Sequence, residues 1–176
     1  PLRLLVVGGS LGAQALNEHV PAALARLPLE RRPQVVHQAG ARHQATLTEL
    51  YARHGVEAEC VAFIDDMAAR YAWADFVVCR GGALTVAELA AVGLGALIVP
   101  LPGAIADEQT ANARYLVDAG GATSITQERL DAATLAGVFA GLTRERALAL
   151  AVAARAVGRH DAAARIADAC LAAGAR

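Results

Sequence analysis

The chain has 176 residues and a formal net charge of −1. This suits one α/β domain and argues against a nucleic-acid partner, which would need a concentrated basic face. Hydrophobic residues make up 56% and charged residues 19%, so a disordered chain is excluded. The three cysteines are widely spaced without a CxxC pair, and we expect small core residues rather than disulfides or a zinc site.

The first segment, residues 2–7, is an apolar run broken only by Arg3, which is typical of a strand buried on both faces of a parallel sheet. It leads into the turn GGSLGA at residues 8–13 and a predicted helix that ends before Pro28. The turn lacks the dinucleotide pattern GxGxxG, because Ser10 stands where a glycine is needed, so NAD or FAD is not expected. Two interpretations remain open: phosphate binding by Ser10 and the turn amides, or tight packing of the helix on the strand.

The next segments alternate between strand and helix. Residues 34–38 form a predicted strand that does not end in an acidic residue. Residues 42–54 form a predicted amphipathic helix that Gly55 closes, and residues 56–63 form a predicted strand that is less buried. The histidines of this region share no metal-ligand spacing, and we expect them to be solvated or capping: His37, His43 and His54.

The loop FIDDM at residues 63–67 leads into another predicted helix, with Asp65 or Asp66 as its N-cap. Tyr71 and Trp73 of that helix are expected to pack on the sheet without a ligand role.

A second strand, glycine turn and helix unit lies at the centre of the chain. Residues 76–79 are an apolar strand, Arg80-Gly81-Gly82 a turn, and helical spacing of apolar residues begins at Ala83. Such a turn offers unpaired N–H groups and the positive end of a helix dipole, which suits a phosphate or diphosphate. Glu88 lies too deep in the helix to cap it and is suited to accept hydrogen bonds from ribose hydroxyls. Residues 107–109, Asp-Glu-Gln, open another helix with side chains able to hold sugar hydroxyls.

The last third contains a glycine-capped helix end with a sixth strand at residues 118–125, and then helix from residue 127 onward. Interruptions are predicted at residues 141–143, where Thr143 begins a new helix, and at residues 158–161. Six strands alternating with helices predict a doubly wound six-stranded parallel sheet of Rossmann-like type. The two glycine turns would flank its ligand crevice if the first and fourth strands are neighbours.

Three phrases, GGSxGAxxxN, GGALTVAELAAVGLGALIVP and DEQTANA, resemble in this order the nucleotide-sugar half of the MurG family of glycosyltransferases. The resemblance covers essentially all 176 residues. It implies one lobe of a two-lobed GT-B enzyme, with residues 1–176 as the C-terminal UDP-sugar-binding domain and the N-terminal acceptor domain absent from this chain. The start at Pro1, two residues before a buried strand, likewise predicts a piece cut at a domain boundary.

The family's activity is then implied for the intact enzyme. It is an inverting transfer of N-acetylglucosamine from UDP-N-acetylglucosamine to undecaprenyl-pyrophosphoryl-muramoyl-pentapeptide in peptidoglycan synthesis, without a metal or cofactor. The general base and acceptor site would belong to the missing lobe, so this chain would hold no catalytic residue and would be inactive alone. The resemblance also implies a cytoplasmic location, with the intact enzyme peripheral on the cytoplasmic face of the inner membrane.

The family's donor-binding positions match residues of this sequence. The resemblance implies that the diphosphate is held by Ser10, Gly82, Ala83, Leu84 and Thr85, the ribose by Glu88, the uracil by the main chain of Ile64, and the sugar by Gln109. Asn112 would cap or stabilise its helix. The sequence departs from the family at Leu11, Gly81 and Glu108, where glutamine, serine, and histidine or glutamine are usual.

Two alternatives stay open. One is another nucleotide-sugar enzyme of the same architecture, such as an epimerase or a glycolipid transferase. The other is a UDP-binding module without catalysis, for which the three departures would be signs of drift.

Overall fold

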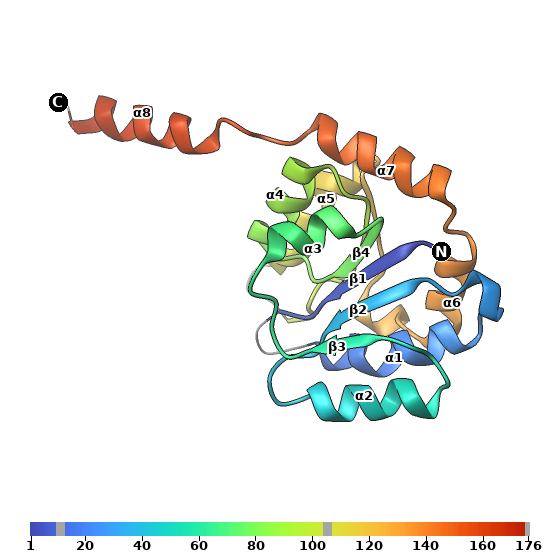
Figure 1. Cartoon of the computed structure of the whole chain (residues 1–176). Helices are drawn as coiled ribbons and strands as arrows, with labels where there is room; N and C mark the ends of the chain where they lie inside the picture. Colours follow the sequence, from blue (N-terminus) through green and yellow to red (C-terminus); the bar gives the residue numbers. More distant parts are fainter. Residues whose placement is uncertain (10–12, 104–106, 175–176) are drawn as a thin grey trace.

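In the computed structural model, which describes residues 1–9, 13–103 and 107–174, a six-stranded all-parallel sheet lies between two layers of helices (Figure 1). The strand order is β3-β2-β1-β4-β5-β6, so the direction of winding reverses between β1 and β4. The predicted doubly wound fold is therefore confirmed. The strands are β1 (Arg3–Val7), β2 (Gln34–Gln38), β3 (Glu59–Val61), β4 (Phe76–Cys79), β5 (Ala96–Ile98) and β6 (Ala122–Ser124).

Helices cover both faces of the sheet because each inner strand is apolar on both sides. In β1, Leu4 and Val6 pack toward α1 (Gln14–Ala25), α2 (Gln44–Arg53) and α6 (Ala132–Ala140). Leu5 and Val7 pack toward α3 (Met67–Trp73), α4 (Ala83–Val92), α5 (Glu108–Val117) and α7 (Arg144–Ala156). These four of the five β1 side chains are at most 9% exposed, so the central strand joins the two hydrophobic cores.

Two predicted elements differ from the structure. The strand expected at residues 56–63 is reduced to β3, which pairs with β2 at the edge of the sheet. The prediction of a helix from residue 127 is wrong at its start. Here η3 (Gln127–Arg129) is a single 3-10 turn, and Leu130 is extended. A new helix, α6, then begins where the Asp131 side chain accepts a hydrogen bond from the Thr134 backbone N–H.

The expectation that the histidines are solvated or capping is wrong for His37, because this residue is fully buried in β2. Its Nδ1 lies 2.9 Å from the hydroxyl oxygen of Tyr51, and its Nε2 has no hydrogen-bond partner among the described residues. Burial lowers the pKa of His37 to about 3, so the ring is neutral in the fold. His43 and His54 occupy the two ends of α2, as a capping position requires, and Gly55 follows with φ of 61°.

The last described helix, α8 (Ala162–Gly174), extends away from the rest of the molecule (Figure 1). Its residues are exposed, including Cys170, so the expectation of a core position is wrong for this cysteine. Cys79 is buried as expected and Cys60 is half-buried. Within the described ranges, no helix combines the length and the apolar character that crossing a membrane would require.

Candidate functional site

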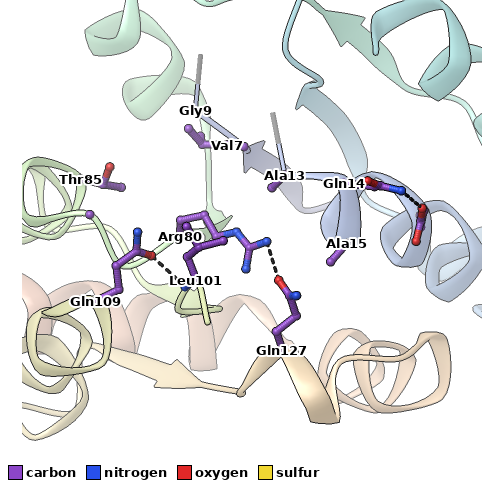
Figure 2. A pocket seen from close by; sticks show the side chains of 13 residues that line it. Val7, Gly9, Ala13, Gln14, Ala15, Arg80, Thr85, Leu101, Gln109 and Gln127 are labelled. Carbon is purple, nitrogen blue, oxygen red and sulfur yellow. Dashed lines mark hydrogen bonds between the residues drawn. The ribbon is translucent and has the colours of Figure 1, made fainter. Parts of the chain in front are cut away.

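The candidate site lies where the turns after β1 and β4 meet. These strands are neighbours in register, with Val7 opposite Cys79, so the turns that follow them lie side by side at the carboxyl edge of the sheet. A pocket of about 660 Å³ opens there, lined by Gly8 and Gly9 from one turn and by Gly82 and Thr85 from the other (Figure 2). The predicted crevice between the two glycine turns is therefore present.

The first turn of α4 supplies free backbone donors to this pocket. Gly82 is the N-cap, no side chain caps the helix, and the first intrahelical bond runs from the Val86 N–H to the Gly82 carbonyl at 3.0 Å. The N–H groups of the residues before Val86 are thus without intrahelical partners, and they lie at the positive end of the helix dipole. The side chain of Leu84 is 80% exposed, so only its main chain suits a polar ligand.

Gln109 and Asn112 of α5 hold the turn after β4 in place. Gln109 Oε1 accepts hydrogen bonds from the N–H groups of Gly81 and Leu101, at 3.1 and 2.9 Å, and Asn112 Nδ2 donates to the Gly81 carbonyl at 3.0 Å (Figure 2 shows the bond to Leu101). The side-chain oxygen of Gln109 is therefore engaged, which leaves its side-chain N–H groups available to a ligand. Asn112 stabilises the neighbouring turn rather than the end of its own helix.

Arg80 is a pocket residue that sequence reasoning missed. Its Nη2 donates to Gln127 Oε1 at 2.7 Å (Figure 2). Its Nη1 donates to the carbonyls of Val99 and Pro100 at 3.2 and 3.4 Å. Burial lowers the pKa of the guanidinium. The sequence held a signal for it, because a charged residue directly after a buried strand, at a predicted ligand edge, is itself a site candidate.

Glu88 stands outside this pocket, on the exposed side of α4, and its carboxylate is oriented by a neighbour. The hydroxyl of Tyr71 donates to Glu88 Oε2 at 2.9 Å. Burial, with Glu88 as a further cause, raises the pKa of Tyr71 well above its ordinary value. Tyr71 packs in the core as expected, but it also fixes a carboxylate to which the family resemblance gives a ligand role.

Ile64 lies at a second, smaller hollow of about 250 Å³, beside Phe63 and Asp65. Its side chain is 5% exposed and packs in the core, so only its main chain is available to a ligand. Because the side chain is buried, replacing it with a smaller one would leave a cavity in the core. Asp66 is the N-cap of α3, since its Oδ1 accepts from the Ala69 N–H at 2.9 Å.

The predicted site residues thus fall into three groups. Gly82, Thr85 and Gln109 line the main pocket together. Four residues lie outside the pocket lining: Ala83 and Leu84 in the first turn of α4, Glu88 further along that helix, and Ile64 at the smaller hollow. Ser10, like Leu11, lies outside the described residues. Glu108 is exposed in the first turn of α5.

The chain matches a known family and curated relatives over nearly its whole length. The model of the glycosyltransferase family 28 C-terminal domain matches residues 3–168. A curated relative from Azoarcus sp. (strain BH72) is 56% identical over 170 residues, covering 97% of this chain and 48% of the relative. Its name is UDP-N-acetylglucosamine–N-acetylmuramyl-(pentapeptide) pyrophosphoryl-undecaprenol N-acetylglucosamine transferase. The chain therefore spans about half the length of such relatives.

Solved structures of glycosyltransferases are similar to this chain as well. The crystal structure of Acinetobacter baumannii MurG is 40% identical, with a TM-score of 0.90 over 96% of this chain and 51% of that one. The glycotransferase of kitacinnamycin, 24% identical with a TM-score of 0.65 over 96% of this chain and 43% of that one, shows the fold alone. Together they confirm the predicted fold, one Rossmann-like lobe of the GT-B type.

Proposed function

Since the chain belongs to the glycosyltransferase family 28 C-terminal domain family, we propose that it is the donor-binding half of a hexosyltransferase of peptidoglycan synthesis. The intact enzyme would transfer N-acetylglucosamine from UDP-N-acetylglucosamine to undecaprenyl-pyrophosphoryl-muramoyl-pentapeptide, at the cytoplasmic face of the membrane. An N-terminal domain outside this chain would bind the lipid-linked acceptor. The observation that carries the proposal is the pocket in which two glycine turns and the uncapped start of α4 meet.

Each part of the donor has a matching group in this lobe. The diphosphate would accept hydrogen bonds from the α4 N-terminal amides of Gly82 to Thr85 and from the turn that contains Ser10. The ribose would donate to Glu88, and the uracil would bond with the main chain of Ile64. The free amide N–H groups of Gln109 would hold hydroxyls of the sugar ring.

The chemistry that these groups support is inverting transfer. The 4-hydroxyl of the acceptor sugar would attack the anomeric carbon from the face opposite the diphosphate, and UDP would leave with the bonding electron pair. Fixed N–H groups aimed at the departing diphosphate stabilise the negative charge that develops on it. The general base would come from the other lobe, so this chain alone would bind the donor without turning over acceptor.

Calorimetric titration of the chain with UDP-N-acetylglucosamine, UDP-glucose and UDP tests the proposal. We expect binding of all three, with the N-acetylglucosamine donor preferred over UDP-glucose. A folded sample that binds none of them would contradict the donor-site assignment. Multiple turnovers of lipid-linked acceptor by the chain alone would contradict the assignment of the base to the other lobe.

A UDP-binding module without sugar chemistry is the second candidate, and one residue favours it. Glu108, which neighbours Gln109, is a carboxylate that cannot donate a hydrogen bond to a sugar oxygen. Equal affinities for UDP and for both UDP-sugars would favour this module over the donor lobe.

A further inference from the structure

The carboxylate of Glu88 is exposed on α4, and a residue of the neighbouring helix holds it. The hydroxyl of Tyr71, on α3, donates a hydrogen bond to Glu88 Oε2 at 2.9 Å. Among the described residues Glu88 takes part in no ion pair. The orientation of this carboxylate therefore depends on a neutral phenol and not on a cation.

Tyr71 is a rigid anchor for this bond. Its side chain is 6% exposed and packs in the core on the α3 side of the sheet. Burial raises the pKa of Tyr71 well above its ordinary value, so the hydroxyl stays protonated and remains a donor. An exposed glutamate samples many rotamers, and a ligand that binds it must first order it. The bond to Tyr71 orders Glu88 before a ligand arrives.

The other two tyrosines of the chain hold groups of a different kind. The hydroxyl of Tyr51 lies 2.9 Å from His37 Nδ1 inside the core. The hydroxyl of Tyr115 donates to the backbone carbonyl of Val157. Neither of these partners has a place in the proposed donor site, whereas the partner of Tyr71 does.

The hydrogen bond also joins the two elements that flank the proposed nucleoside site. Helix α3, which carries Tyr71, begins three residues after Ile64, where the uracil is proposed to bind. Helix α4, which carries Glu88, begins at the turn proposed for the diphosphate. In a nucleoside diphosphate the ribose connects these two groups. The bond therefore fixes the carboxylate at the boundary where the ribose of such a ligand would lie.

We propose that Tyr71 is a positioning residue that holds Glu88 toward the ribose hydroxyls and thereby makes the site select ribonucleotides over nucleotides that lack these hydroxyls. The inference rests on the proposed function for the identity of the ligand. Tyr71 acts through Glu88 and does not touch the ligand: Oε2 accepts from the phenol, and Oε1 remains to accept from a ribose hydroxyl.

Calorimetric titration of the chain with UDP and with 2′,3′-dideoxy-UDP, which lacks both hydroxyls, tests the inference. Tyr71→Phe keeps the ring and removes the donor. We expect UDP affinity to fall about 3- to 10-fold, as for one lost hydrogen bond, and dideoxy-UDP affinity to stay the same. In a Glu88→Ala background, Tyr71→Phe should cause no further loss, because the carboxylate that it orients is gone. Tyr115→Phe is the matched control and should leave both affinities unchanged.

The outcomes separate the inference from the proposed function. Equal losses for the two ligands, an unchanged UDP affinity in folded Tyr71→Phe, or additive losses in the double variant would each overturn the inference alone. Failure of the unmodified chain to bind UDP would contradict the proposed function and overturn the inference with it.

A second measurement applies if Tyr71→Phe does not fold. It is 13C relaxation of the Glu88 side chain in the unmodified chain without ligand. Motion as free as that of the exposed Glu57 would overturn the inference, and restricted motion would support it.

Discussion

Gln109 and Gly81 are joined twice, once by a hydrogen bond and once by close contact. The Gly81 N–H donates to the side-chain Oε1 of Gln109 at 3.1 Å. A Cβ added at Gly81 would lie 2.4 Å from the backbone carbonyl oxygen of Gln109. A side chain at position 81 would therefore require α5 or the turn to shift from the position that it has in this structure. This contact couples the turn that begins α4 to the helix that carries the predicted sugar-binding side chain.

Gly81→Ala should accordingly destabilise the chain and weaken UDP-sugar binding. The obstructing atom belongs to backbone, so α5 must shift, and we expect a loss of about 1–3 kcal/mol in the free energy of unfolding. Urea unfolding and calorimetric titration measure the two effects. Gly82→Ala is the matched control, because a Cβ there meets only Thr85 Oγ1 at 3.7 Å and φ at Gly82 is −65°. Equal stabilities of the two variants would contradict the steric argument.

Glu88→Ala should weaken UDP binding by about 1.5–3 kcal/mol, since a carboxylate that accepts from a ribose hydroxyl would be lost. Tyr71→Phe should cost less, because it removes only the hydroxyl that orients Glu88. Repeating both titrations with 2′-deoxy-UDP gives the control, as the effect of Glu88→Ala should shrink when a ribose hydroxyl is missing. An identical effect on both ligands would remove Glu88 from the ribose site.

His37 should make stability fall as the pH drops below about 6.5. Burial lowers its pKa in the folded chain from 6.5 to about 3, so between these pH values the unfolded chain takes up a proton that the folded chain does not. The contribution of neutral His37 to the free energy of unfolding is complete above pH 6.5 and is lost toward pH 3. The free energy of unfolding falls by at most about 1.4 kcal/mol per pH unit in this range.

Denaturant unfolding of His37→Gln across this pH range measures the effect. The amide can replace the hydrogen bond to Tyr51 without titrating, so we expect a flatter dependence of the unfolding free energy on pH. His54→Gln, at the exposed end of α2, should leave the slope unchanged. A slope that persists in His37→Gln would show that another group is responsible.

Asp66→Ala should lower the free energy of unfolding by about 1 kcal/mol, because the N–H of Ala69 loses its cap. The adjacent Asp65→Ala is the control: Asp65 is exposed and the α3 cap belongs to Asp66, so a change within about 0.5 kcal/mol is expected. Thermal unfolding of both variants measures the two losses of stability. Equal losses would mean that the negative charge, and not the cap on the Ala69 N–H, stabilises α3.

Much of the architecture follows from local sequence. The strands at residues 34–38 and 76–79 were predicted at their observed bounds. A short apolar run between turn residues is typical of a buried strand in an α/β domain. The adjacency of β1 and β4, which the sequence analysis could state only as a condition, is confirmed. Caps such as Asp66 and Thr143 were also predictable, since they depend on residues three positions apart.

The sequence by itself thus determined the order of the elements and the two glycine turns, because backbone preference and apolar spacing act over a few residues. Only the tertiary structure decided which side chains meet at and beside the candidate site. Arg80 meets Gln127 across 47 positions, Gln109 meets Gly81 across 28, and Tyr71 meets Glu88 across 17. Burial of His37 likewise depends on how α1 and α2 cover the sheet. No local pattern encodes such contacts, since each arises when two separately formed units pack against each other.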